Sequence, residues 1–286
     1  MTSYLVTGGG GMLAAELARA LAGREVTVAT RADLDITDQA AVDDAVPGND
    51  VIINAAAWTN VDAAESQEAE ATLVNGEGAA NLARAAAKAG AVLVQVSTDY
   101  VFDGRATTPY AESAPRHPVS AYGRSKAVGE QRAMDLNPER TIIVRTAWLY
   151  GTGGANFAKT MLRLAGERDT LAVVDDQLGQ PTWAGDLAGQ LVDLLDTGTT
   201  TGILHGTNSG EATWYDFARA IFEEAGLDPE RITRTTSAEF VRPAPRPGYS
   251  VLGHDGWAAT GLVPMRPWRD ALSAAFSAGL RDIIQK

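Results

Sequence analysis

Residues 3–23 read SYLVTGGGGMLAAELARALAG and are the most informative segment for the fold class. A short apolar run comes first, four glycines follow, and an alanine- and leucine-rich helical pattern closes the segment. A strand, a glycine-rich loop and a helix in this order are typical of the unit that opens a dinucleotide-binding domain. In that unit the backbone N–H groups at the start of the helix bind a pyrophosphate.

The glycines fit two spacings of the dinucleotide-binding pattern. One spacing uses Gly9 and Gly11, the other uses Gly8 and Gly11, and both place Ala14 third, where the helix packs on the strand. We expect Gly11 to be the most important glycine, because the backbone approaches the pyrophosphate there. Gly8 is expected to form the tight turn. Gly9 and Gly10 are expected to be more replaceable.

The glycine loop has two alternative interpretations, a P-loop for ATP and a tight turn without a ligand. A P-loop for ATP needs Gly-Lys-Ser/Thr after the glycines, whereas Met12 and Leu13 follow here. Met12 and Leu13 are also expected to line the dinucleotide. A glycine-rich turn without any ligand is the other alternative, and the alternation of strands and helices downstream favours the dinucleotide over it.

The first half of the chain alternates strand and helix patterns. Nearly continuous apolar runs, typical of strands buried on both faces of a parallel sheet, occupy residues 3–8, 25–30, 50–57, 91–98 and 141–151. Helical patterns lie between them, at residues 12–23, 38–46, 71–90 and 121–134. This alternation predicts an α/β fold with a Rossmann-type doubly wound parallel sheet, whose ligands bind at the carboxyl ends of the strands.

The second half has a looser rhythm and predicts a smaller C-terminal substrate-binding domain. We expect residues 1–150 to form the NAD(P)-binding domain and residues 151–286 mainly to bind substrate, with about 171–208 returning to the first domain. The predicted helices are 156–167, 188–198, 213–226 and 266–280, and the strands are 171–177 and 202–208. Residues 240–253 hold too many prolines for a helix or a central strand, so they form a linker or an ordered loop that reaches a ligand.

Composition limits the classes of partner. The chain has 286 residues, 45% of them hydrophobic, a formal net charge of −12 and no cysteine. Without a run of Lys or Arg, binding to nucleic acid or to an anionic membrane is not expected. The absence of cysteine fits a reducing compartment, no room precedes the first strand for a signal peptide, and no apolar run approaches about 20 residues. We therefore expect a cytoplasmic protein.

Residues after the second and third strands indicate which dinucleotide binds. The acidic residue that usually meets the adenine ribose is replaced by Arg31, which suits a 2′-phosphate. This favours NADPH and leaves NADH open; the alternative is that Arg31 is a solvated loop residue. Asp35 and Ile36 are expected to border the adenine. Three small residues would let the chain pass close to the cofactor: Ala55, Ala56 and Ala57.

Three polar side chains form a candidate catalytic group. Thr98 ends the fourth strand, where its hydroxyl can donate a hydrogen bond to a substrate carbonyl. Tyr122 and Lys126 stand four residues apart and so share one helix face. A cation beside a phenol is expected to lower its pKa from about 10 and make it a better acid. A Tyr and Lys at this spacing are often only an exposed pair, so their position after Thr98 gives the pattern its value.

Longer motifs give a more specific indication. The chain resembles the extended short-chain dehydrogenase/reductases and, more narrowly, the dTDP-4-dehydrorhamnose reductase family. The matching stretches run from Val6 to beyond Leu252: NAAAWTNVDAAES, VNGEGAANLARAA, VSTDYVFDG, YGRSKAVGE, VRTAWLYG, NFAKTMLRLA, VVDDQLGQPT and RPAPRPGYSVL. The resemblance implies that hydride from NADPH reduces the C4 ketone of a dTDP-linked 4-keto-6-deoxy sugar. It implies Tyr122 as the acid, Lys126 on the nicotinamide ribose and Thr98 on the carbonyl.

The resemblance also implies a substrate site. Asp99 and Tyr100 would border the sugar, and Asn156 and Phe157 would face the nucleotide. Trp148 would pack on the substrate, although a core aromatic is the plainer interpretation. Arg246 would meet the diphosphate, whereas a solvated loop arginine is the alternative. The substrate-binding positions that the resemblance implies are Thr98, Asp99, Tyr100, Trp148, Asn156, Phe157 and Arg246.

The chain departs from the family pattern at two places. Tyr249 stands where many members carry Asn. Some relatives join a dimer through a metal held by glutamates; Glu16 is present here, but the second position falls near Gly185, which has no side-chain oxygen. We therefore expect no metal, and a homodimer would have to form without one. Two alternative functions stay open: reduction of another dTDP-4-keto sugar, as in streptose or antibiotic deoxysugar pathways, and a cofactor-binding regulatory subunit without turnover.

Overall fold

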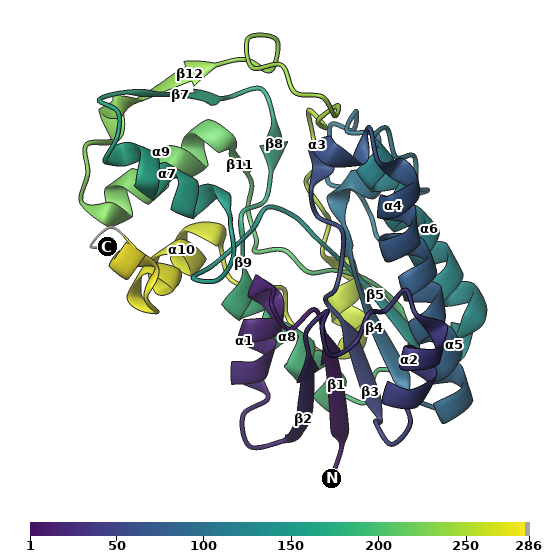
Figure 1. Ribbon diagram of the computed structural model, residues 1–286. Coiled ribbons are helices and arrows are strands. Elements are labelled where there is room, and N and C mark those ends of the chain that lie inside the picture. The colour runs from purple at the N-terminus through teal and green to yellow at the C-terminus, as the bar shows by residue number, and fades with distance from the viewer. Residues whose placement is uncertain (284–286) are drawn as a thin grey trace.

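A six-stranded parallel sheet forms the larger lobe of the computed structural model, which describes residues 1–283 (Figure 1). Its strands, in spatial order, are β10 (Gly202–His205), β5 (Thr141–Thr146), β4 (Val92–Thr98), β3 (Val51–Asn54), β1 (Ser3–Thr7) and β2 (Glu25–Ala29). The prediction of a Rossmann-type α/β fold is confirmed.

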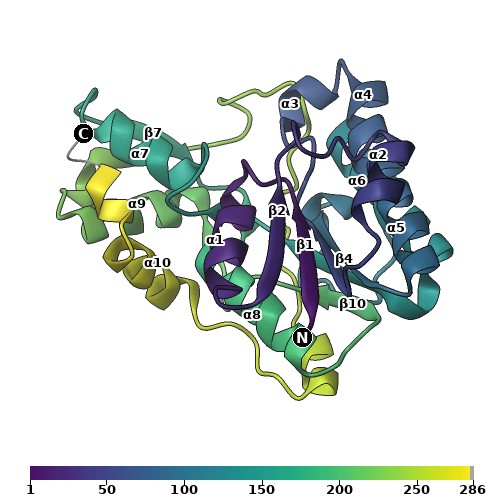
Figure 2. The ribbon, with the colours of Figure 1, turned by 60° about the horizontal axis from the view of Figure 1, so that its bottom comes forward.

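Both faces of the sheet are covered by helices (Figures 1 and 2). Val6 and Ile53 pack with α1 (Met12–Ala20) and α8 (Ala184–Asp196) on one face. Leu5 and Ile52 pack on the other face. The helices there are α2 (Gln39–Ala45), α5 (Gly78–Ala89) and α6 (Ala121–Leu136). Neighbouring residues of a strand point to opposite faces, so continuous apolar runs are what two buried faces require.

The strand order places a switch point between β1 and β3. The chain moves outward from β1 to β2, then crosses to β3 and continues through β4 and β5 in the opposite direction. Loops at the carboxyl ends of β1 and β3 therefore diverge, which leaves a crevice where ligands bind in folds of this kind. The glycine loop follows β1 and residues 55–57 follow β3, so both lie at this point.

The smaller lobe has its own apolar core. It contains α7 (Phe157–Ala165), α9 (Trp214–Ala225), α10 (Trp268–Ser277) and the parallel pair β7 (Leu171–Val174) with β12 (Ile232–Thr235). Phe217, Ile221 and Leu272 are fully buried in this core. Two short pairs complete the strands: β6 (Leu149–Tyr150) with β9 (Thr182–Trp183), and β8 (Leu178–Gly179) with β11 (Ala212–Thr213).

The chain crosses between the lobes more than once. Of residues 171–208, α8 and β10 lie on the sheet, whereas β7 pairs with β12 in the smaller lobe. Trp257 and Met265 also pack in the sheet's core. The return to the first lobe therefore begins near Ala184, and a second return follows in the C-terminal region.

Some elements differ from the predicted ranges. The predicted helix 71–90 divides into α4 (Glu68–Thr72), a π-helix (Leu73–Glu77) and α5. α8 begins at Ala184, four residues before the predicted start, and the extended residue Trp183 stands at its N-cap position. α3 (Val61–Ala64) and β12 carry no prediction. Short 3-10 helices occupy Asp99–Val101, Pro138–Arg140, Pro229–Arg231, Asp255–Thr260 and Leu280–Ile283.

No helix within residues 1–283 is long and apolar enough to span a membrane.

Candidate active site

The glycine loop is folded tightly against its neighbours. Gly8 has φ +77°, and a Cβ there would lie 2.7 Å from the Ala56 nitrogen. A Cβ on Gly9 would lie 3.0 Å from the Ala29 carbonyl carbon, whereas one on Gly10 would meet nothing within 4 Å. Gly8 is therefore the most constrained glycine of this loop, and Gly9 is less replaceable than expected because it packs against the end of β2.

The start of α1 suits a pyrophosphate. Gly11 is the N-cap residue, and in the described part of the chain no side chain caps this end of the helix. The open space above Gly10 adjoins it, so an anion can approach the helix N-terminus and its partial positive charge. The side chain of Leu13 is buried in the core, so its part in binding would come from its backbone. Met12 packs against Gly151 and Gly153 at the edge of the smaller lobe.

The loop after β2 places Arg31 in solvent. Its side chain is 82% exposed and lies 3.5 Å from Asp35. The Asp35 carboxylate accepts hydrogen bonds from the backbone and hydroxyl of Thr37, which lower its pKa. Ile36 is buried against Gly78, so its side chain packs in the core and only its backbone could border an adenine.

A buried polar network joins the carboxyl ends of β1 and β3 to the middle of β4. Thr7 donates to the Asn54 side-chain oxygen at 2.7 Å, and the Asn54 amide donates to Gln95 at 2.8 Å. Asn54 also accepts from the backbone N–H of Ala56, 3.2 Å away. The network thus fixes the turn made by Ala55, Ala56 and Ala57 beside Gly8. These alanines are partly exposed, as a surface that a cofactor passes over must be.

Thr98 and Asp99 lie together at the end of β4. Thr98 is 6% exposed and donates from Oγ1 to the Asp99 carboxylate at 2.9 Å. The second oxygen of Asp99 is buried and has no hydrogen-bond partner among residues 1–283. Burial raises the pKa of Asp99 to about 6, while the nearby Ser250 and Thr98 hydroxyls oppose that rise.

Tyr122 and Lys126 reach this strand end from the first turns of α6. The Tyr122 ring packs edge-on against Tyr100 at 5.5 Å, and the Lys126 ammonium donates to the carbonyl of Val96 at 2.7 Å. The pKa of Tyr122 is raised to about 12, mainly by burial; the Thr98 hydroxyl opposes this rise and the Asp99 carboxylate adds to it. The expected lowering by Lys126 is therefore absent here, because the ammonium points to Val96.

Burial also affects Lys126 itself. Its side chain is almost fully buried, and burial lowers its pKa to about 8, although the carboxylate of Glu130 opposes the change. Burial therefore disfavours the positive charge on Lys126. The ammonium lies at the carbonyl of Val96, two residues before Thr98 on β4. The phenol, the hydroxyl and the ammonium converge at one strand end, next to the switch point of the sheet.

The model of the RmlD substrate binding domain matches residues 1–280. The chain belongs to this family. The resemblance to the dTDP-4-dehydrorhamnose reductases, drawn from the motifs, is thereby confirmed.

Individual relatives cover nearly the whole chain. A dTDP-4-keto-6-deoxy-D-glucose reductase of Streptomyces niveus is 50% identical over 96% of this chain and 96% of its own. A dTDP-4-dehydrorhamnose reductase of Streptomyces griseus is also 50% identical, over 96% of this chain and 93% of its own. The crystal structure of the Bacillus anthracis dTDP-4-dehydrorhamnose reductase with NADP is 36% identical, covers 97% of this chain and 100% of its own, and has a TM-score of 0.94.

Trp148, which family resemblance places at the substrate, lies between the two lobes. Among residues 1–283 it is the non-glycine residue with a positive φ, +47°, a conformation that costs about 1 kcal/mol or more in a bulky residue. Its indole stacks on Trp214 at 3.5 Å, and a Cβ on Gly179 would lie 2.6 Å from it. The ring is thus packed like a core aromatic, yet it stays partly exposed, as a residue that packs on a substrate would be.

Asn156 and Phe157 begin α7 beside this tryptophan pair. Asn156 caps the helix by accepting from the Lys159 N–H at 3.0 Å, and its amide donates to the Gly151 carbonyl at 2.9 Å. Phe157 packs on Trp214 at 4.6 Å. Asn156 therefore shapes the loop that precedes α7, and both its side-chain oxygen and its side-chain nitrogen form hydrogen bonds within the protein.

Arg246 is bound to the larger lobe. Its guanidinium donates to Asp62 at 2.8 Å and to the Ala244 carbonyl at 3.0 Å, and its side chain is 18% exposed. It is therefore an ordered loop residue, unlike the solvated arginine of the alternative interpretation.

The positions that depart from the family pattern have ordinary surroundings. Tyr249 donates its N–H to the Gly104 carbonyl and lies 6.4 Å from the Tyr110 ring. Glu16 pairs with Arg19 on α1, and a Cβ on Gly185 would strike Trp183. No cluster of metal-ligating side chains occurs among residues 1–283. The expectation of no metal stays a prediction.

Asn75 carries no prediction from the sequence, but its hydrogen bonds connect it to the helix that presents Tyr122. It lies in the π-helix, accepts from the N–H of Trp58 at 2.8 Å and donates to Ser125 at 2.9 Å. Ser125 in turn donates to the Tyr122 carbonyl. A π-helix often marks a functional site, and the VNGEG stretch, with glycines inside a helical run, was the available signal.

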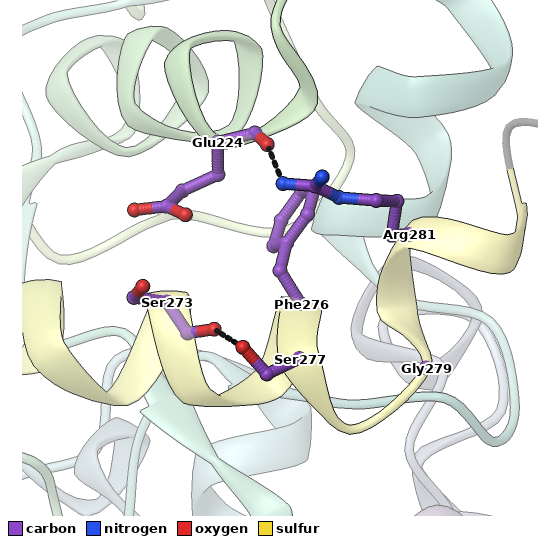
Figure 3. Close-up of a pocket in the computed structure, with 6 residues that line it drawn as sticks. All are labelled: Glu224, Ser273, Phe276, Ser277, Gly279 and Arg281. Atoms are coloured by element: carbon purple, nitrogen blue, oxygen red, sulfur yellow. Dashed lines mark hydrogen bonds between the residues drawn. The ribbon is translucent and has the colours of Figure 1, made fainter.

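A cavity of about 330 Å³ lies elsewhere, between α9 and α10 (Figure 3). Arg281 donates to the Glu224 carbonyl at 2.9 Å, and Ser277 donates to the Ser273 carbonyl at 3.1 Å. None of the predicted site residues lines it. The candidate active site is therefore the strand-end group and not this cavity.

Proposed function

We propose that this chain reduces the C4 ketone of dTDP-4-dehydro-L-rhamnose to the alcohol of dTDP-L-rhamnose, with NADPH as the reductant. The observation that carries the proposal is the convergence of Thr98, Tyr122 and Lys126 near the carboxyl end of β4, on the same edge of the parallel sheet as the glycine loop after β1. Names of relatives at 50% identity and the NADP complex of a similar protein support the same reaction.

The fit to a dinucleotide rests on the loop geometry. The uncapped N-terminus of α1 and the space above Gly10 suit the pyrophosphate, and Gly8 permits the close turn. Arg31 would pair with the 2′-phosphate, because its exposed guanidinium can turn from Asp35. When bound, the nicotinamide supplies the hydride.

Each catalytic side chain has a definable task. The Thr98 hydroxyl polarises the ketone by donating a hydrogen bond, which stabilises negative charge on the oxygen. Tyr122 stays protonated throughout the neutral range, since its pKa is raised to about 12, and it gives its proton to the developing alkoxide. Lys126 binds the nicotinamide ribose and places positive charge near the phenol when the substrate is present.

The substrate residues carry proposed roles of their own. Asp99 and Tyr100 border the sugar from the end of β4, and Trp148 offers its free face to it. Asn156 and Phe157 shape the nucleotide side of the site. Arg246 meets the diphosphate, because a guanidinium fork matches phosphate oxygens.

A second candidate substrate has an observation in its favour. The Streptomyces niveus relative is named a dTDP-4-keto-6-deoxy-D-glucose reductase and is as similar to this chain as the rhamnose-type relative. The same hydroxyl, phenol and ammonium would serve either sugar, so the sugar's stereochemistry is decided by the shape of the loops around it.

A substrate panel tests the proposal. The oxidation of NADPH and of NADH is followed by absorbance with dTDP-4-dehydro-L-rhamnose and with other dTDP-4-keto-6-deoxy sugars. The fastest turnover is expected with the first sugar and NADPH. Turnover of other sugars alone would favour the second candidate, and cofactor binding without any turnover would favour a regulatory subunit.

We also propose a cytoplasmic location and a homodimer that forms without a metal. Cell fractionation tests the first. Light scattering during size exclusion, with and without EDTA, tests the second.

A further inference from the structure

Residues 236–253, called the strap below, connect the two lobes. Figure 1 shows this chain leaving β12 and crossing to α3. At its start, Ser237 donates to the Asp176 carboxylate from both N–H and hydroxyl. At its end, the Tyr249 N–H donates to the Gly104 carbonyl at 3.0 Å. The strap is therefore held at both ends and carries Arg246 between them.

Asp62 is the contact that fixes the middle of the strap. One of its oxygens accepts from Arg246 at 2.8 Å and from the Ala244 N–H at 3.3 Å. The other lies 3.5 Å from the guanidinium of Arg242. A single carboxylate thus organises two arginines and one backbone group that lie about 180 residues further along the chain.

The segment that carries Asp62 is itself tied to the catalytic helix. Glu65 accepts from the N–H of Ala121, the first residue of α6, at 2.8 Å. Glu68 forms a two-bonded pair with Arg124 on the same helix, both at 2.7 Å. The position of the strap is therefore set relative to the helix that presents Tyr122.

The charges leave a net attraction for an anion. Two guanidinium groups share one carboxylate, so the group retains one positive charge in a protein of net charge −12. Arg246 uses its bonds to Asp62 and Ala244, and a guanidinium with five N–H donors keeps others for a phosphate. An exposed ion pair would contribute little, but the Arg246 and Asp62 side chains are only 18% and 24% exposed.

We propose that Asp62 is a positioning residue that holds Arg246, and more loosely Arg242, in place for the diphosphate of the sugar nucleotide. The inference rests on the proposed function, in which Arg246 meets that diphosphate. Without Asp62 the arginine side chain would have to be ordered at the moment of binding, and the affinity would fall by that cost.

Binding of dTDP alone tests the inference without relying on turnover. Isothermal titration calorimetry measures the dissociation constants of dTDP and of NADPH for the wild type, Asp62→Ala, Asp62→Asn, Arg246→Ala and the Asp62→Ala/Arg246→Ala double variant. Glu167→Gln, which breaks an exposed pair with Arg163 on α7, is the matched control. Thermal unfolding of each variant is recorded as well.

We expect Asp62→Ala to weaken dTDP binding about tenfold, with NADPH binding unchanged. Asp62→Asn keeps one acceptor oxygen and should lose less. The double variant should bind dTDP within about twofold of Arg246→Ala, because Asp62 acts through that arginine. Glu167→Gln should match the wild type.

Several results would overturn the inference. Additive losses in the double variant, or an equal loss of NADPH binding, would mean that Asp62 acts elsewhere or only supports folding. Tighter dTDP binding by Asp62→Ala would mean that Asp62 competes with the diphosphate. If the wild type binds dTDP and Asp62→Ala weakens it, yet no keto sugar is reduced, the inference stands and the proposed function falls.

Discussion

The hydroxyl of Thr98 donates its single proton to the carboxylate of Asp99, 2.9 Å away. That same proton is the one Thr98 would need for a substrate ketone. When Asp99 is protonated it can donate to the Thr98 oxygen instead, which frees the Thr98 proton. Because burial raises the pKa of Asp99 to about 6, this exchange falls within an accessible pH range.

Asp99→Asn should remove a pH dependence from turnover. In the wild type we expect kcat/KM to fall as pH rises through about 6, since Asp99 then ionises and captures the Thr98 proton. An asparagine amide can donate to Thr98 at every pH. The variant should therefore show no fall in kcat/KM as pH rises through about 6. The measurement is kcat/KM from pH 5 to 9. A limb near pH 6 that persists in the variant would assign it to another group.

The same substitution should change stability in a pH-dependent way. The folded pKa of Asp99 lies above its ordinary value of 3.8, so the wild type loses stability as pH rises from about 4 to 6. Asp99→Asn should therefore unfold at a temperature about 2–5 °C higher at pH 8 and show no such gain near pH 4. Equal shifts at both pH values would contradict the assignment to ionisation.

Tyr122→Phe should separate chemistry from binding. The phenol supplies the proton, so kcat should fall by about 10²–10⁴-fold, while NADPH affinity stays within about twofold. Stopped-flow absorbance at a fixed cofactor concentration measures the first quantity, and fluorescence titration measures the second. Full turnover by the variant would rule out Tyr122 as the acid.

Lys126→Met should trade activity for stability. The buried ammonium has a pKa lowered to about 8, so below that pH the fold carries a charge that burial disfavours. Its contribution to stability improves as pH rises from about 8 to 10.5, where the unfolded chain still holds the proton. The variant should therefore be more stable than the wild type by about 2 kcal/mol at pH 7. At pH 10 this advantage over the wild type should be smaller. Urea unfolding at both pH values checks this, and an equal difference at both would contradict it.

Local patterns were enough to predict the sheet and the strand-end group. Buried parallel strands need apolar residues on both faces, so runs such as residues 91–98 are recognisable without any partner. Thr98 ends such a run, and the spacing of Tyr122 and Lys126 follows from helix geometry. Because parallel strands end on one edge, their order along the chain predicts that Thr98 and the glycine loop lie on the same edge of the sheet.

Contacts between distant segments could not be predicted in this way. The pair of Asp62 with Arg246 and the stacking of Trp148 on Trp214 depend on how the lobes meet. The direction of the Lys126 side chain depends on Val96, which sequence spacing does not reveal. The expectation of a lowered Tyr122 pKa was wrong for this reason, since burial outweighs a cation that points elsewhere.

Alanine substitutions at Gly8, Gly9 and Gly10 should lower stability in the order of the space available at each glycine. Gly8→Ala should lower the stability of the cofactor-free protein by about 2 kcal/mol or more, because of its positive φ and the 2.7 Å approach to Ala56. Gly9→Ala should cost less, since its closest approach is 3.0 Å. Gly10→Ala should be neutral within about 0.5 kcal/mol. Thermal unfolding without NADPH gives the order, and a Gly10 variant as unstable as the Gly8 variant would contradict it.

Arg31→Ala tests which dinucleotide the loop after β2 selects. The side chain is 82% exposed and only 3.5 Å from Asp35, so its removal should leave the unfolding temperature unchanged. If its guanidinium pairs with the 2′-phosphate, KM for NADPH should rise about tenfold while KM for NADH stays the same. Asp35→Asn is the informative companion, because it removes the carboxylate that competes for Arg31 and should lower KM for NADPH. Equal effects of Arg31→Ala on both cofactors would place the arginine away from the 2′-phosphate.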